Sequence, residues 1–159
     1  MPDGHTLDLK EQYRGACVRR DRLIAARDRT TLELEQRLCA AGFSPEVVKV
    51  IVEDAQESGL VDDERFTRFY VNGKLRRGWG QKRIERELQR FGVCLEQFEG
   101  YPDAYFGGAD ELERACSLLE RYHTRAKNQR EARFRHLLSK GFSAEICQKA
   151  ILQLTIFDA

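Results

Sequence analysis

The stretch that decides the fold is Gly42-Phe43-Ser44-Pro45-Glu46-Val47, because it occurs again as Gly141-Phe142-Ser143-Ala144-Glu145-Ile146 and, more weakly, as Gly92-Val93-Cys94-Leu95-Glu96. The three glycines recur at steps of 50 and 49 residues, and each follows a leucine four positions earlier: Leu38, Leu88 and Leu137. Such a glycine ends a helix, the leucine packs its last turn, and the residue two places after the glycine caps the next helix. The pattern therefore predicts an internal repeat of helices.

A period of this length fits three helices per unit, slightly more than the roughly 40 to 47 residues of HEAT and armadillo repeats. We expect an all-α protein of three tandem three-helix repeats, stacked into an elongated curved array. The repeats are predicted at residues 10–61, 62–104 and 105–159, after a flexible leader at residues 1–9. Their helices are predicted near 11–28, 31–41 and 45–58; 63–77, 81–91 and, shortened, 95–99; and 110–125, 129–140 and 144–155. The glycines and proline at 100–102 and 107–108 predict a hinge or linker.

Two segments carry competing signals for strands. Asn72-Gly73 is a typical hairpin dipeptide, but its flanking residues do not alternate as those of paired strands do. The β-branched run Val47–Val52 favours a strand locally, yet it follows Ser44, Pro45 and Glu46, which together form a helix start. Both segments are therefore predicted to be helical.

The composition indicates a folded chain: 33% of its 159 residues are charged, 42% are hydrophobic, and the net charge is +1. Its longest apolar runs have four residues, against roughly 18 needed to span a membrane. Five cysteines without a C-x-x-C pair favour a reducing compartment. We therefore expect a cytoplasmic protein without a membrane partner.

Three adjacent carboxylates, Asp62, Asp63 and Glu64, are the strongest candidate for a metal site. Consecutive helical residues point in different directions, however, whereas metal ligands must converge. The preferred interpretation is that Asp62 caps a helix and that Asp63 and Glu64 stabilise its first turn. The histidines show no ligand spacing, and no Walker A, G-x-S-x-G or H-E-x-x-H motif occurs. No enzymatic activity, metal or other cofactor is predicted.

Charge is strongly segregated along the chain. Residues 46–64 carry seven acids and one base, whereas residues 65–90 carry nine bases and two acids. A solvated helix face normally mixes signs, so the basic centre favours a surface for phosphates or for an acidic protein. The candidate binding residues are Arg68, Lys74, Arg76, Arg77, Trp79, Lys82, Arg83, Arg86 and Arg90.

Within this centre, Gly78-Trp79-Gly80 forms a flexible turn that enters a helix. The free N–H groups of that helix start could meet an anion beside Lys82 and Arg83. Two interpretations of Trp79, the only tryptophan, stay open. It is either a core residue between helices or an exposed platform for a base or a partner side chain.

Together these residues resemble the RecX family of recombinase regulators. The similarity rests on Glu57-x-Gly59-Leu60-x-Asp62-Asp63-x-Arg65-Phe66, then Gly78-Trp79-Gly80, Lys82-Arg83-Ile84, Glu87-Leu88 and Gly92-Val93. In the third unit, Arg133-Phe134, Leu137-Leu138 and Lys140-Gly141-Phe142 resemble the last repeat of that family. The family pattern is specific over residues 57–93 and weaker over about 18–155.

The resemblance implies a crescent of three helical units with a basic face, acting as a non-enzymatic modulator of RecA. Proteins of this family bind the RecA filament on single-stranded DNA and suppress its assembly, ATP hydrolysis and strand exchange. The expected partners are therefore the RecA filament and possibly single-stranded DNA. The alternative is a stand-alone nucleic-acid-binding protein that uses the same basic residues without RecA.

Overall fold

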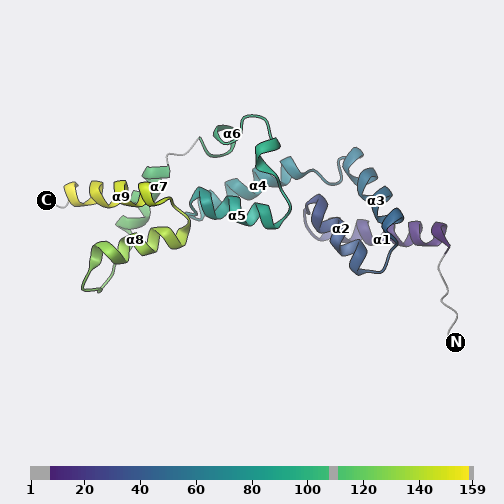
Figure 1. Ribbon diagram of the computed structural model, residues 1–159, viewed down its shortest axis with the longest axis horizontal. Coiled ribbons are helices and arrows are strands. Elements are labelled where there is room, and N and C mark those ends of the chain that lie inside the picture. Colours follow the sequence, from purple (N-terminus) through teal and green to yellow (C-terminus); the bar gives the residue numbers. More distant parts are fainter. Residues whose placement is uncertain (1–7, 108–110, 158–159) are drawn as a thin grey trace. The chain divides into compact units, whose positions relative to one another are not determined.

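Helices alone make up the secondary structure of the residues that the computed structural model describes, 8–107 and 111–157 (Figure 1). They are α1 (Leu9–Ala26), α2 (Thr31–Ala40), α3 (Pro45–Glu57), α4 (Asp63–Arg76), α5 (Gln81–Arg90), a 3-10 helix η1 (Leu95–Gln97), α6 (Asp103–Phe106), α7 (Glu111–Glu120), α8 (Gln129–Lys140) and α9 (Ala144–Phe157). The predicted all-α fold is confirmed, including the helical conformation of Val47–Val52 and of Asn72-Gly73.

The chain forms two compact units. The first runs to Phe66 and includes Phe91–Val93, and the second comprises Thr67–Arg90 and the chain from Cys94 onward. The division into three repeats at residues 62 and 105 remains a prediction, and part of the proposed leader lies outside the described residues.

The core of the first unit is built by α1, α2 and α3. Because apolar residues recur at steps of three and four along α3, Val47, Val48, Ile51 and Val52 are all buried on one side of it. They pack with Leu34 and Leu38 of α2 and Ala16 and Leu23 of α1. Burying each large aliphatic side chain contributes about 1.5 to 3 kcal/mol, so this apolar face, rather than β-propensity, decides the conformation of α3.

Polar groups at the start of α2 tie together distant parts of the first unit. Thr30 is fully buried, accepts a hydrogen bond from the Glu33 N–H and donates one to the Phe91 carbonyl over 2.7 Å. The Asp63 carboxylate accepts a hydrogen bond from the Thr31 N–H at 2.8 Å. Asp63 therefore stabilises the start of α2, a role that its position next to Asp62 did not predict.

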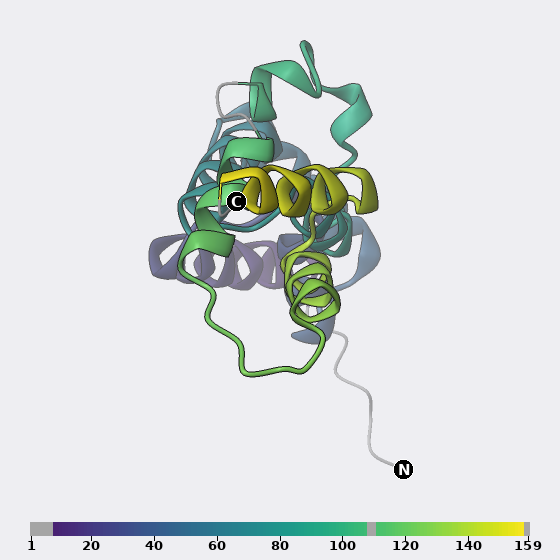
Figure 2. The ribbon, with the colours of Figure 1, turned by 90° about the vertical axis from the view of Figure 1, so that its left-hand side faces the viewer.

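The second unit contains a core of α7, α8 and α9. Ala115 and Leu119 of α7 pack with Leu137 of α8, with Phe142, and with Cys147, Ala150 and Ile151 of α9. The predicted extension of α7 to residue 125 is wrong, because the helix ends at Glu120 and a long loop leads to α8 (Figure 2). In that loop Tyr122 stacks on His136 of α8, with 4.0 Å between the ring centroids.

Residues 100–107 are a second correction. The shortened helix predicted at 95–99 is the 3-10 helix η1, and the predicted hinge contains the short helix α6. Tyr105 and Phe106 of α6 are buried and their rings pack with those of Phe98 and Tyr101, so this segment is a packed part of the second unit and not a solvated linker. Gly108, which completes the predicted glycine pair, lies outside the described residues.

The repeated glycines end helices as predicted. Gly42, Gly92 and Gly141 have φ angles of +88°, +77° and +95°, values that glycine adopts without steric cost. Leu38, Leu88 and Leu137 are fully buried. After two of these glycines, the N–H of Phe43 bonds to the Leu38 carbonyl and that of Phe142 to the Leu137 carbonyl. This hydrogen bond is the Schellman closure of a helix end.

The predicted caps are only partly confirmed. Ser143 accepts a hydrogen bond from the Ile146 N–H at 3.2 Å, and Asp62 accepts one from the Arg65 N–H at 2.9 Å. Ser44 stands at the N-cap position of α3, but its side chain does not cap that helix. The backbone N–H of Ser44 donates a hydrogen bond to the Gln12 side chain.

We predict opposite effects of the same substitution at two glycines of the second unit. Gly73 lies in α4 with no atom within 4 Å of an added Cβ, so Gly73→Ala should raise the free energy of unfolding by about 0.5 to 1 kcal/mol. A Cβ on Gly80 would lie 2.4 Å from backbone atoms of Gly141 and Phe142. Gly80→Ala should therefore lower it by about 1 to 3 kcal/mol. Chemical denaturation checks both values, and equal effects would contradict the described packing.

The cap at Asp62 gives a second prediction. Asp62→Ala should lower the free energy of unfolding by about 0.5 to 2 kcal/mol, because the Arg65 N–H loses its acceptor. Asp62→Asn keeps a side-chain oxygen at the same place and should remain within a few tenths of a kcal/mol of the unsubstituted protein. Equal losses in the two variants would show that the charge of Asp62, and not its cap, stabilises α4.

Candidate partner-binding surface

All nine candidate binding residues belong to the second unit. Helix α4 contributes Arg68, Lys74 and Arg76, the following turn contributes Arg77 and Trp79, and α5 contributes Lys82, Arg83, Arg86 and Arg90. Lys74, Trp79 and Arg83 are half-buried, and the other six are exposed. The run from residue 65 to residue 84 contains seven bases and no acid. We call the exposed bases Arg76, Arg77, Lys82, Arg86 and Arg90 the basic surface.

Trp79 organises the half-buried part of this region. The Lys74 ammonium lies 4.0 Å from the centroid of its indole ring, and the Arg83 guanidinium lies 3.7 Å from it. Such cation–π contacts are worth about 0.5 to 2 kcal/mol each. Trp79 is half-buried, and its ring contacts two cations of the protein itself, while its part in binding a partner remains a prediction.

A backbone contact fixes the turn that carries Trp79. The Gly80 N–H donates a hydrogen bond to the Lys140 carbonyl over 2.8 Å. A Cβ on Gly141 would lie 2.2 Å from the Cβ of Arg83, so α5 and the turn between α8 and α9 approach each other closely at this glycine. The end of α8 therefore determines where the first turn of α5 lies.

The start of α5 was predicted to meet an external anion, and the structure corrects this. The Gln81 N–H donates to the Glu111 carboxylate at 3.1 Å, and the Gly80 N–H is taken by Lys140. A carboxylate from α7 thus supplies the negative charge that a helix start favours. An incoming anion would have to bind to side chains instead.

Two grooves lined by arginines offer such side chains. The first, of about 340 Å³, lies between the end of α4 and α7 and is lined by Leu75, Arg76, Arg77, Gly78, Glu113, Arg114, Ser117, Leu118 and Arg121. The second, of about 200 Å³, lies between α5 and the end of α8 and is lined by Arg83, Arg86, Glu87, Arg90, Leu138, Ser139 and Gly141. In each groove arginines outnumber the single acid, so both favour an anionic ligand.

Glu85 and Glu87, the two acids among the nine bases of residues 65–90, have different partners. Glu85 accepts hydrogen bonds from Gln81, at 2.8 Å, and from the Tyr101 hydroxyl. Burial is the main cause that raises the pKa of Tyr101, and the hydrogen bond to the charged Glu85 raises it further. Glu87 lies 3.4 Å from Arg90. Since Glu85 is held by groups of its own unit, Lys82 and Arg86 remain available to bind a partner.

Arg68 differs from the other binding candidates, and Asp62 and Asp63 have structural roles. The Arg68 guanidinium lies 4.7 Å from the centroid of the Tyr105 ring and so helps to hold α6. Asp62 and Asp63 act as helix caps, as described above. Within residues 8–107 and 111–157, no three histidine, cysteine or acidic side chains are grouped so that they could hold a metal ion.

Three further residues of the second unit were not among the candidates from the sequence. Arg114 and Arg121 of the α7 region line the first groove. Phe69 of α4 is the most exposed large apolar side chain of the described residues. Phe69 lies within a run of bases without acids. The sequence alone could therefore have indicated it as a binding residue, because aromatic residues between bases are typical of nucleic-acid surfaces.

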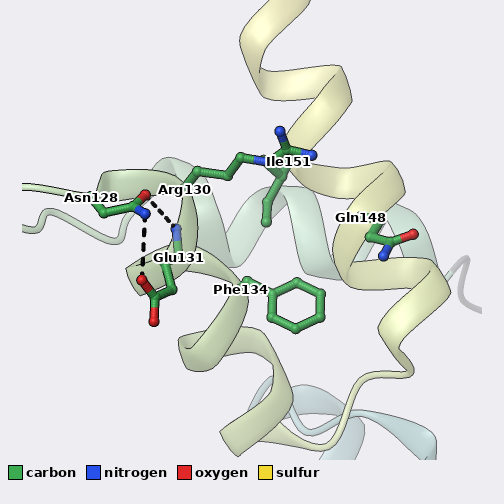
Figure 3. A pocket seen from close by; sticks show the side chains of 6 residues that line it. All are labelled: Asn128, Arg130, Glu131, Phe134, Gln148 and Ile151. Carbon is green, nitrogen blue, oxygen red and sulfur yellow. Dashed lines mark hydrogen bonds between the residues drawn. The ribbon is translucent and has the colours of Figure 1, made fainter.

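A further cavity, of about 290 Å³, lies between α8 and α9 (Figure 3). Phe134 and Ile151 form its apolar part, and Arg130 extends over it. Asn128 and Glu131 at its edge are hydrogen-bonded to each other. None of the predicted binding residues lines this cavity.

Comparisons with known proteins agree with this arrangement. A family model described as RecX, second three-helix domain, matches residues 62–97, the segment that holds most of the basic surface. Two solved structures share the fold at 21% identity, each covering 93% of this chain. RecX from Lactobacillus salivarius superimposes with a TM-score of 0.72 over 97% of its own length. Another regulatory protein RecX does so with 0.70 over 79%. Among the described residues, no helix is long and apolar enough to cross a membrane.

Sequence relatives lead to the same family. The regulatory protein RecX of Chromohalobacter salexigens is 34% identical over 134 residues, which cover 82% of this chain and 86% of the relative. That of Halorhodospira halophila is 34% identical over 132 residues, which cover 78% of each chain. This chain belongs to the RecX family of regulatory proteins.

Proposed function

We propose that this protein binds the RecA recombinase and its filament on single-stranded DNA and inhibits filament assembly, ATP hydrolysis and strand exchange. Family membership supports RecA as the partner. The observation that carries the proposal is the basic surface, four of whose five exposed bases line two grooves in one unit. The surface of a protein–DNA filament carries phosphates and acidic side chains, both of which suit such grooves.

In this proposal the protein acts by occupancy and not by catalysis. Bound to the filament, it would hinder the addition of further RecA subunits and the movements that accompany ATP hydrolysis. Asp62 and Asp63, two of the three carboxylates of the candidate metal site, serve as helix caps, and this mechanism gives them no catalytic role. A recombinase partner places the protein in the cytoplasm.

The second candidate is a nucleic-acid-binding protein that does not act through RecA. It is favoured by the arginines of the two grooves, which suit phosphates regardless of a protein partner. Gel filtration with RecA, with and without DNA, separates the candidates. Co-elution with RecA in the absence of DNA supports the first candidate, whereas co-elution with DNA alone and none with RecA alone supports the second.

We predict that reversing two exposed charges of α5 abolishes most of the inhibition. Lys82→Glu with Arg86→Glu should raise the concentration that half-inhibits DNA-dependent ATP hydrolysis by RecA about 10-fold or more, because two attractive contacts become repulsive. These side chains are preferable to Arg83, whose contact with Trp79 stabilises the fold. The assay at two salt concentrations should show weaker inhibition at higher salt.

The matched control is Arg19→Glu with Arg22→Glu, two exposed bases on α1 of the first unit. Arg20 is unsuitable because it pairs with Asp54 at 2.5 Å. The control should inhibit like the unsubstituted protein. If the α5 variant folds normally and inhibits as well as the control does, the functional surface lies elsewhere.

A further inference from the structure

Helix α4 carries one aromatic side chain, Phe69, that is mostly exposed to solvent. The Phe69 side chain is 70% exposed, whereas Phe66, one turn earlier, packs edge-on against Phe91 at 5.6 Å. No other large apolar side chain of α4 is exposed. An exposed ring contributes little to folding, because it gains none of the free energy of burial.

The residues beside Phe69 leave the ring accessible. Asn72, Gly73 and Arg76 follow it by three, four and seven positions, so they lie on the same face of α4, and all three are exposed. Gly73 has no atom within 4 Å of an added Cβ. The helix surface one turn after Phe69 is therefore uncovered, and a flat group could lie there.

Arg76 connects this face to the first groove. It lies about 10 Å along the helix from Phe69, since each residue of an α-helix rises 1.5 Å. It also lines the groove together with Arg77, Arg114 and Arg121. A single anionic chain could therefore contact Phe69, pass Gly73 and reach four arginines.

We propose that Phe69 is a stacking platform for a base of single-stranded DNA, whose phosphates continue to Arg76 and the first groove. This inference rests on the proposed function, in that it gives the DNA of the filament a direct contact with this protein. The role that the sequence offered to Trp79 falls to Phe69, because the Trp79 ring already contacts Lys74 and Arg83.

The surroundings of Phe69 favour a nucleic acid over an apolar protein groove. Protein interfaces are centred on several clustered anchors that exclude water together. Here a single exposed ring is followed on its helix face by an amide, a glycine and an arginine, without an acid from residue 65 to residue 84. A base offers a flat face to a single ring, and its backbone supplies the negative charge, which is how sequence-independent binders hold single strands.

The test compares two labelled strands of equal length, an oligothymidylate and an abasic oligodeoxynucleotide, by fluorescence anisotropy with the full-length protein. Phe69→Ala should weaken binding of the oligothymidylate about 5- to 100-fold. It should leave binding of the abasic strand unchanged, because only the base is lost as a partner. Phe69→Trp should restore the affinity, and its added fluorescence should be quenched by the oligothymidylate and not by the abasic strand.

Two variants serve as further arms of the same experiment. The Cβ of Gly73→Leu meets no atom within 4 Å, so the variant should fold, yet it should weaken oligothymidylate binding by covering the helix backbone one turn after Phe69. Leu152→Ala removes a 63% exposed side chain from α9 of the same unit and should change neither affinity. Circular dichroism of each variant establishes that the helices persist.

Several outcomes would overturn the inference. They are equal binding of both strands by the Phe69→Ala variant and the unsubstituted protein, an equal loss for both strands, or no binding of single-stranded DNA at all. Weaker binding to RecA without DNA, at unchanged oligothymidylate affinity, would also overturn it and assign Phe69 to a protein partner. Failure of the unsubstituted protein to inhibit RecA would refute the proposed function alone, since the oligonucleotide measurements need no RecA.

Discussion

The close approach of two backbones, at Gly80 and at Gly141, is the constraint on which the second unit depends. Added Cβ atoms at these glycines would lie 2.4 Å and 2.2 Å from the neighbouring segment, so no other residue fits either position without displacement. The contact places the start of α5 beside the end of α8, which brings Arg83 to within 3.4 Å of the Ser139 carbonyl. The second groove, between α5 and the end of α8, exists because of this contact. Gly141 thus has two functions, since its φ of +95° also ends α8.

The charged side chains of the second unit fall into two groups, which are acids that bind groups of the unit itself and bases that are exposed to solvent. Glu111 binds the start of α5, and Glu85 accepts a hydrogen bond from Tyr101, so two of its acids bind groups of the unit itself. The basic surface, by contrast, contributes little to stability, because exposed ion pairs are worth only about 0 to 1 kcal/mol. Uncompensated positive charge at exposed positions adds self-repulsion to the folded state. An anionic partner would relieve this repulsion on binding.

The sequence predicted whatever depends on neighbours along the chain. The glycine helix ends at Gly42, Gly92 and Gly141, the cap at Asp62 and most helix boundaries are local, and the structure has them. The misses depend on contacts between distant residues. Helix α7 stops early where Tyr122 stacks on His136, and α6 forms where Tyr105 and Phe106 find an apolar surface. The anion expected at α5 is Glu111, thirty residues away. Trp79 is the clearest case, because its two possible roles differed only in tertiary surroundings.

The candidate residues consequently fall into two groups that a sequence cannot separate. Lys74, Trp79 and Arg83 are half-buried, and both cations contact the Trp79 ring, so their loss should disturb the position of α5 and with it the second groove. Arg76, Lys82 and Arg86 are exposed, and their loss should leave the fold intact. Weaker binding after substitution in the first group is therefore ambiguous between folding and recognition, whereas in the second group it reports recognition. A basic residue of this protein is informative about the partner only when its side chain does not stabilise the fold, and that property depends on the packing around the side chain rather than on the count of charges.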